Sequence, residues 1–326
     1  MKVLFVCSGN SKNFSISPFI KSQGESIKSQ GIEVQYFSIM KKGFQGYIQE
    51  AIRLRFFLKE NHFDVIHAHY SLSAWCAVLA FSGIPIVMSL MGDDANGKYK
   101  ASGKKVYMSY VLIIASWLIQ FFVCKIICKS AYMQRIIINK KKSVIIPNGV
   151  VLQEVQPFDK QQQRQLLNLE EDKIYLLFLG NTKDRNKNFQ LLKKAFNLMQ
   201  SENEKLLAPY PIEHGKVVQY LNAVDVLVVP SLMEGSPNVV KEAMACNTTV
   251  VATDVGDIRW LFGEEKGYYI TDFTPEDCAN NLKKAVEYST CQGKTNGRQR
   301  IIDLGLSSVS VAERIISLYK EILNVD

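Results

Sequence analysis

The sequence lacks the features that mark several classes of protein. It has seven cysteines among 326 residues, and no two of them form a CxxC pair. An odd number of scattered cysteines, mostly inside apolar runs, is typical of a reduced intracellular protein rather than a disulfide-stapled one. The N-terminal apolar stretch is too short for a secretory signal, so we expect no cleavage and a cytoplasmic location. Internal repeats and low-complexity tracts are also absent.

Acidic residues are scarce in the first half of the chain. Residues 1–150 contain 19 Lys and Arg but only 7 Asp and Glu, whereas the remainder contains 20 and 24. The two halves should therefore have different partners. A basic half suits nucleic acid, an anionic membrane surface or a phosphate-bearing acceptor. No nucleic-acid-binding motif is present, so we expect the latter two partners and no nucleic acid.

The first residues have the pattern of a doubly wound α/β domain. A strand at Lys2–Cys7, a helix from about Ser17 to Gln30 and a strand at Glu33–Ser38 form one βαβ unit. Gly9 follows the first strand, where a glycine either lets a ligand approach the backbone or makes a plain tight turn. The GxGxxG fingerprint is absent, so both interpretations stay open.

The most informative segment is Val226–Thr253. An apolar run that ends at Pro230 predicts a buried strand, and a polar loop, a helix and a second strand follow at the spacing of a parallel crossover. Pro237 suits the first helical position, because its missing N–H would be unpaired there, and the next three amides could bind phosphate. Glu234 and Glu242 could face the same crevice and accept hydrogen bonds from hydroxyl groups. Phosphate donors beside hydroxyl acceptors suit a nucleotide-sugar.

This segment, EGSPNVVKEAMAC followed by VVATDVG, resembles the signature of the retaining glycosyltransferases of family four. The resemblance covers nearly the whole chain and implies the GT-B fold, with two Rossmann-like domains that face each other across a cleft. Its E-x7-E pair places Glu234 by the donor sugar and Glu242 on the ribose. The expected parts are an acceptor-binding domain at 1–155, a nucleotide-sugar-binding domain at 156–306, and a C-terminal helix at 307–326 that packs back across the domain boundary.

A second loop resembles the phosphate-binding G-R-x(n)-K-G loop of the same family. Lys187 matches the lysine that holds the donor diphosphate, but Asn181 stands where the family has arginine. Arg185 or Lys183 would then have to supply the second positive charge. Between this loop and Glu234 the chain is short for the family, so we expect a somewhat trimmed second domain.

The acceptor side is expected at the carboxyl ends of the N-terminal strands. The family often has His-x-His at such a strand end, and we favour His69 as a cleft residue and His67 as structural. Two histidines without a third ligand make a metal site unconvincing, so none is expected. Met91 replaces the histidine of the family's HGxD motif and cannot transfer a proton. His69 or Asp94 would then orient the acceptor, unless Asp94 only caps a helix or turn.

One stretch has the length and composition of a membrane span. Residues 106–124 are 19 residues without a formal charge, flanked by lysines. The family pattern instead splits the stretch into a helix ending near Leu118 and a strand, Phe121–Cys128. We expect a surface helix that docks on anionic lipid, with a true span as the alternative.

Together these features predict a metal-independent, retaining hexosyltransferase of bacterial surface-glycan (polysaccharide) synthesis, peripheral on the inner face of the plasma membrane. Its acceptor would be a glycan or lipid-linked oligosaccharide, and its donor substrate a nucleotide-sugar, with a UDP-sugar expected and no cofactor. The alternatives are a non-catalytic GT-B partner subunit and a nucleotide-sugar epimerase. The expected catalytic residues are Glu234, Lys187, Arg185, His69 and Asp94. The expected donor-binding residues are Gly9, Gly180, Asn181, Lys187, Glu234, Gly235, Ser236, Asn238, Val239, Val240 and Glu242.

Overall fold

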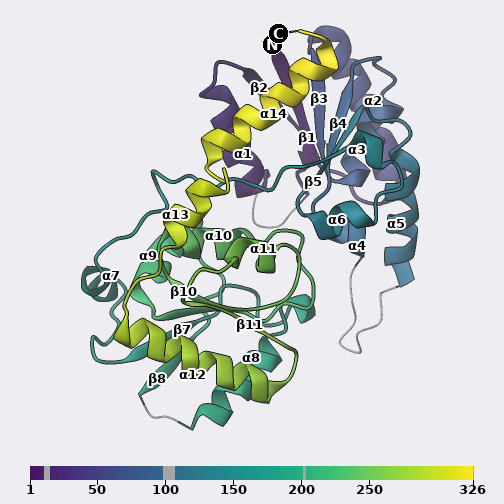
Figure 1. Cartoon of the computed structure of the whole chain (residues 1–326). Helices are drawn as coiled ribbons and strands as arrows, with labels where there is room; N and C mark the ends of the chain where they lie inside the picture. Colours follow the sequence, from purple (N-terminus) through teal and green to yellow (C-terminus); the bar gives the residue numbers. More distant parts are fainter. Residues whose placement is uncertain (11–14, 98–106, 201–202, 326) are drawn as a thin grey trace. The chain divides into compact units, whose positions relative to one another are not determined.

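The computed structural model describes residues 1–10, 15–97, 107–200 and 203–325, which divide into two compact units (Figure 1). Among the described residues, unit 1 comprises 1–97, 107–149 and 308–325, and unit 2 comprises 150–200 and 203–307. The chain therefore enters unit 2 once and returns to unit 1 with its last helix.

Unit 1 is built on a six-stranded sheet in the order β2-β1-β3-β4-β5-β6, with every neighbouring pair parallel. Most of its strand residues are buried, as expected of a parallel sheet covered on both faces. The strands are β1 (Lys2–Ser8), β2 (Glu33–Ile39), β3 (Val65–His69), β4 (Ile86–Ser89), β5 (Lys125–Cys128) and β6 (Ser143–Ile145).

Helices cover both faces of this sheet (Figure 1). On one face α1 and α14 pack over side chains such as Val3 and Phe5. On the other face α2, α3 and α5 pack over side chains such as Leu4 and Val6, which alternate with the first set along β1. The helices are α1 (Pro18–Lys28), α2 (Gly43–Glu60), α3 (Ser71–Leu79), α4 (Asp93–Asn96), α5 (Tyr107–Ile119), α6 (Ala131–Arg135), η1 (Lys140–Lys142) and α14 (Ser308–Leu323).

The uncharged stretch at 106–124 forms a short helix and a turn. Helix α5 ends at Ile119, which confirms the predicted end near Leu118. The strand after it begins at Lys125, four residues later than predicted, because Phe121–Cys124 form the turn. At 13 residues α5 is about 20 Å long, short of the ~30 Å hydrocarbon core. Within the described ranges no helix is long and apolar enough to cross a membrane.

Unit 2 is built on a five-stranded parallel sheet in the order β11-β10-β9-β7-β8. Helices α8 and α12 cover one face, and α9, α10, α11 and α13 cover the other. The strands are β7 (Ile174–Leu177), β8 (Glu204–Leu207), β9 (Val226–Val229), β10 (Thr249–Thr253) and β11 (Tyr268–Thr271). The helices are α7 (Lys160–Leu166), η2 (Arg185–Lys187), α8 (Phe189–Met199), α9 (His214–Ala223), α10 (Asn238–Ala245), α11 (Ile258–Phe262), α12 (Pro275–Cys291) and α13 (Gly297–Asp303). The predicted α/β class with two parallel-sheet domains is confirmed.

The last helix, α14, contributes to the core of unit 1. Tyr319 is fully buried, and its hydroxyl bonds to Nδ1 of His67 on β3. Nε2 of the same imidazole lies 2.8 Å from Ser89 Oγ on β4. Burial lowers the pKa of His67 well below its usual value, so the ring is neutral and has one donor and one acceptor nitrogen for these two hydroxyls. The Lys125 ammonium on β5 also pairs with Glu321 at 2.6 Å.

Removing the Tyr319 hydroxyl should destabilise unit 1. Tyr319→Phe leaves one nitrogen of a buried imidazole without its partner, which costs about 1–3 kcal/mol. The free energy of unfolding can be followed by tryptophan fluorescence in a Trp260→Phe background, where the remaining tryptophans, Trp75 and Trp117, both lie in unit 1. Tyr132→Phe, at an exposed position on α6, is the control. Equal unfolding midpoints for the two variants would contradict this role.

Candidate active site

The strand order of unit 2 defines where a ligand can bind. The chain runs from β7 outward to β8 and then returns past β7 to β9, so the loops after β7 and β9 diverge at the carboxyl edge of the sheet. Open parallel sheets bind ligands in the crevice at such a switch point. Both loops singled out in the sequence, Gly180–Asn188 and Pro230–Pro237, lie there.

Three contacts join these two loops. The Lys187 ammonium lies 2.6 Å from Glu234 Oε1. The Asn186 side-chain amide donates to Met233 O at 2.8 Å, and the backbone carbonyl of Asn186 accepts from Leu232 N at 2.8 Å. The structure therefore brings together the predicted phosphate-binding lysine and the predicted sugar-side glutamate. Both side chains are partly shielded from water, with 33% and 14% exposed.

The other predicted residues of the first loop have different surroundings. The Asn181 side-chain oxygen accepts from Lys183 N at 2.9 Å, so it closes a turn inside the loop. Arg185 is exposed in η2, and Asp184 caps that turn by accepting from Asn186 N. A Cβ on Gly180 would lie 3.2 Å from the ring of Phe178, so the glycine lets the loop leave the strand closely packed.

Helix α10 begins one residue later than predicted. Pro237 is the N-cap rather than the first helical residue, because its ψ of 115° is extended. The amides of Asn238, Val239 and Val240 still lie in the first turn, where backbone N–H groups have no helical acceptor and attract anions. Glu242 follows in the second turn and is half-buried.

A third loop, after β10, supports the glutamate loop. Gly256 has a φ of +65°, and a Cβ there would lie 2.8 Å from Gly235 O and 3.0 Å from Glu234 O. Only glycine permits this close approach. The Thr253 hydroxyl donates to Ser231 O at 2.6 Å and fixes the start of the same loop.

Two buried charges lie beneath this loop, and the sequence analysis assigned a function to neither. Lys241 on α10 is fully buried, and burial lowers its pKa to about 8 against the opposing charges of Asp257 and Glu242. Asp257 is 7% exposed, and burial raises its pKa to about 6 against the opposing effect of the Lys241 charge. Neither Asp257 oxygen has a hydrogen-bond partner among the described residues. The sequence offered one sign of this arrangement, because Lys241 falls on the side of α10 that faces the core.

In unit 1 the strand order reverses between β1 and β3, and His69 is the last residue of β3. It is 2% exposed, and neither ring nitrogen has a partner among the described residues. The ring stacks on His67 with centroids 4.3 Å apart, as expected of residues i and i+2 in a strand. Burial lowers the pKa of His69 well below its usual value. Tyr70 follows with a φ of 92°, a strained conformation that is frequent at functional sites.

Asp94 ties two loops of unit 1 together. Its carboxylate accepts from the backbone N–H groups of Ser71, Met91 and Gly92 at 2.9–3.0 Å. Burial raises its pKa to about 6 although these three bonds oppose the shift. The geometry matches the turn-forming alternative. Gly9 is likewise explained by packing, since a Cβ there would lie 2.6 Å from Ser38 Cβ.

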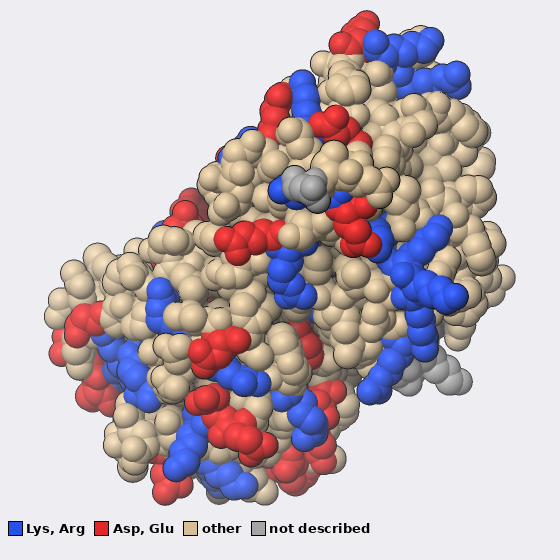
Figure 2. All heavy atoms as spheres, turned by 45° about the horizontal axis from the view of Figure 1, so that its top comes forward, with Lys and Arg blue, Asp and Glu red and all other residues tan. Residues whose placement is uncertain are grey.

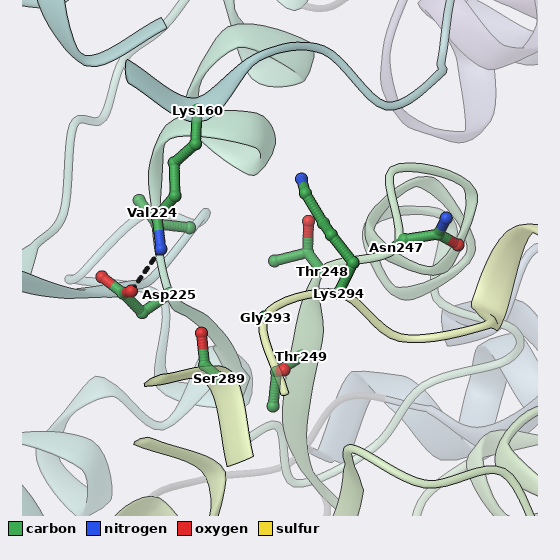
Figure 3. Close-up of a pocket in the computed structure, with 9 residues that line it drawn as sticks. All are labelled: Lys160, Val224, Asp225, Asn247, Thr248, Thr249, Ser289, Gly293 and Lys294. Atoms are coloured by element: carbon green, nitrogen blue, oxygen red, sulfur yellow. Dashed lines mark hydrogen bonds and ion pairs between the residues drawn. The ribbon is translucent and has the colours of Figure 1, made fainter. Parts of the chain in front are cut away.

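A cavity of about 190 Å³ in unit 2 lies away from these loops. Asp225 precedes β9 and Thr249 begins β10, so the cavity is at the amino edge of the sheet (Figure 3). Lys160 pairs with Asp225 across it, and Arg164 reaches the second oxygen of the same carboxylate at 2.8 Å. In the parts of the chain that the structure describes, no group of three or more His, Cys, Asp or Glu residues is arranged to hold a metal ion.

Profiles of known protein families match segments in both halves of the chain. The profile described as Glycosyltransferase Family 4 matches residues 3–154, and that described as Glycosyl transferases group 1 matches residues 210–287. Sucrose-phosphate synthase from Thermosynechococcus elongatus superimposes with a TM-score of 0.80 at 19% identity, covering 99% of both chains. The Anabaena protein Alr3699/HepE, solved with UDP and glucose, gives 0.75 at 16% identity and covers 98% of this chain and 99% of its own. The fold is therefore GT-B.

Curated relatives agree with this class. The putative teichuronic acid biosynthesis glycosyltransferase TuaC of Bacillus subtilis is 27% identical over 230 residues, which are 62% of this chain and 56% of that protein. D-inositol 3-phosphate glycosyltransferase 2 of Catenulispora acidiphila is 24% identical over 311 residues, 78% of this chain and 67% of that protein. The chain spans a little over half the length of the first of these relatives. It belongs to the GT-B glycosyltransferases of family 4.

Lys241 and Asp257 should be energetically coupled. Removing one partner leaves the other charge buried and uncompensated, so Lys241→Met and Asp257→Asn should each destabilise unit 2 by about 3 kcal/mol. The double variant should lose clearly less than the sum of the two. Trp260, on α11 in unit 2, reports unfolding in a Trp75→Phe, Trp117→Phe background. Strictly additive losses would show that the two charges do not interact.

Proposed function

We propose that the chain is a retaining glycosyltransferase that moves a hexose-type sugar from a nucleotide-sugar to a hydroxyl acceptor. The observation that carries the proposal is the Lys187–Glu234 pair beside the start of α10, at the switch point of the unit 2 sheet. A cation and the backbone amides at a helix start suit a diphosphate, and carboxylates suit sugar hydroxyls. The Anabaena relative of the same fold was solved with UDP-glucose, which supports a UDP-sugar as donor.

The proposed mechanism stabilises the leaving group electrostatically. As the glycosidic bond breaks, negative charge grows on the diphosphate, and the Lys187 ammonium and the amides of Asn238–Val240 neutralise it without a cofactor or metal ion. The 2.6 Å contact with Glu234 holds Lys187 in place before the donor arrives. Glu234 then orients the sugar hydroxyls, and Glu242 accepts from the ribose. Retention of anomeric configuration is the part of the proposal taken from the family.

On the acceptor side we assign different tasks to the two candidates. His69 has two unsatisfied nitrogens and a neutral ring, so it can accept a hydrogen bond from an acceptor hydroxyl. Asp94 holds the loops after β3 and β4 in place through its three backbone bonds. The acceptor is proposed to be a growing surface glycan or lipid-linked oligosaccharide at the cytoplasmic face of a membrane, in line with the name of the Bacillus subtilis relative, a putative teichuronic acid biosynthesis glycosyltransferase.

Activity assays with UDP-sugars separate this function from its rivals. Transfer, or slow donor hydrolysis without acceptor, supports the proposal and excludes a non-catalytic subunit. Conversion of the donor into its epimer with no free UDP would instead identify an epimerase. Absence of UDP binding in a thermal-shift experiment would overturn the assignment of the unit 2 site.

Substitutions in the first loop should distinguish a diphosphate clamp from a solvated loop. Lys187→Ala should lose roughly 2–4 kcal/mol of transition-state stabilisation, mainly in kcat, because its charge contact strengthens as the bond breaks. Arg185→Ala should lose a comparable amount and, like Lys187→Ala, bind UDP more weakly. Asn181→Arg should gain little, since the charge is already supplied.

The matched control is Lys194→Ala, an exposed lysine on the neighbouring helix α8. Calorimetric UDP affinity and steady-state kinetics of all variants form the measurement. If Arg185→Ala keeps full activity and UDP affinity, the second charge does not come from Arg185, and Lys183→Ala becomes the next test.

A further inference from the structure

Helix α5 of unit 1 has its apolar side outward. Its solvent-facing stripe consists of large hydrophobic residues that are 39–78% exposed: Tyr107, Tyr110, Val111, Ile114, Trp117 and Leu118. The buried side contains Ile113 and Ile119 together with Ser109 and Ser116, so large apolar residues lie on both sides of the helix. Surface helices of soluble proteins normally have charged and polar residues on the side that faces water. Phe121 and Phe122, in the turn that follows, extend the stripe and are 61% and 60% exposed.

Helix α2 has a second stripe of the same kind. Phe44, Ile48, Ile52 and Phe56 recur every four residues, so they lie along one side of the helix, and they are 38–81% exposed. Arg55 and Lys59 fall within this stripe and are exposed. Lys41 and Lys42, just before the helix, are exposed as well. The α2 surface is therefore both apolar and cationic.

The two stripes belong to the same layer of unit 1. Helices α2, α3 and α5 cover one face of the sheet, with α3 in contact with both others (Figure 1). Phe81 follows α3, between α2 and α5 in the sequence, and is 70% exposed. In Figure 2 a broad uncharged expanse on the right of the view borders a group of Lys and Arg side chains. Exposed apolar surface of this extent marks an interaction site.

Cations also lie at the end of α5. Lys142 donates to the carbonyls of Gln120, Phe121 and Val123, which fixes the η1 turn against the end of the α5 stripe. The other two lysines of that turn, Lys140 and Lys141, are exposed. Tyrosine, tryptophan and phenylalanine beside lysine form the side-chain set that favours the boundary between lipid headgroups and acyl chains.

We propose that the outer faces of α2 and α5, here called the α2–α5 face, dock unit 1 on an anionic lipid bilayer. The hydrophobic stripes enter the interface, and the exposed lysines and arginines contact acidic headgroups. Helix α5 lies in the plane of the membrane, because it is too short to cross it. A second copy of the chain fits less well, because two identical cationic faces would repel each other. This inference does not depend on the sugar chemistry of unit 2.

Bromolipid quenching tests insertion directly. In a Trp75→Phe, Trp260→Phe background, Trp117 on the α5 stripe is the only tryptophan. With vesicles of phosphatidylcholine and phosphatidylglycerol, its emission should shift to shorter wavelength and be quenched by brominated acyl chains. The matched control keeps Trp260 instead, which is 46% exposed in unit 2 and should not be quenched. Quenching of Trp260 alone, or of neither, would overturn the proposal.

Vesicle sedimentation tests the two components of the surface. Lys140→Ala with Lys141→Ala should weaken binding roughly 30-fold, given ~1 kcal/mol for each basic residue near an anionic surface. Ile114→Asp with Leu118→Asp should weaken it at least as much. Raising salt from about 0.05 to 0.3 M should release the wild type, since exposed charges are screened over ~10 Å at 0.1 M.

The control variants carry substitutions of the same two types, lysine to alanine and large apolar residue to aspartate, in unit 2. They are Lys283→Ala with Lys284→Ala on α12, and Leu198→Asp with Phe273→Asp, all at exposed positions. Their vesicle binding should equal that of the wild type. Equal binding by all variants, or binding to phosphatidylcholine alone, would overturn the proposal. So would a stable dimer in sedimentation velocity that Ile114→Asp with Leu118→Asp dissolves. UDP affinity, measured in parallel, should be unchanged in every variant, which separates this proposal from the function of unit 2.

Discussion

The candidate site of unit 2 depends on the reversal of strand order between β7 and β9. Because parallel strands all end at the same edge, the loops that follow these two strands start side by side and then diverge. Lys187 and Glu234 are 47 positions apart in the sequence, yet this topology brings their charged atoms to 2.6 Å. The third loop packs against the glutamate loop at Gly256, so backbone packing positions Glu234, and the ion pair in turn positions Lys187.

The sequence predicted this fold well where hydrophobic patterns are long or motifs are specific. The strands β1, β2, β9 and β10 and the helices α1, α10 and α14 lie within a few residues of their predicted positions. Helix α3, with the small apolar sequence SLSAWCAVL, was not predicted, since it has no polar face to give a helical period. The short helices α7, α11 and α13 were missed because one or two turns carry too few residues for any pattern.

Individual residues of the candidate site could be predicted only where they belong to a recognisable sequence motif. Lys187, Glu234 and the start of α10 came from local sequence. What local sequence could not give is the burial of Lys241 and Asp257, 16 positions apart, because burial is decided by elements that pack against each other in three dimensions. The same holds for His67. Its two hydroxyl partners come from β4 and from a helix more than 250 positions later.

The exposed apolar stripes of unit 1 are not explained by packing within the unit. A helix that exposes tryptophan, leucine and isoleucine while serines occupy two of its buried positions gains less from folding in water than one that buries its large apolar residues. A protein selected only for the stability of unit 1 would not keep such a stripe on α5 and a second one on α2. The two stripes differ in sequence and period but share their chemistry and their layer. That coincidence is explained by a common apolar, anionic surface outside the protein, and the basic bias of residues 1–150 supplies the charge that such a surface requires.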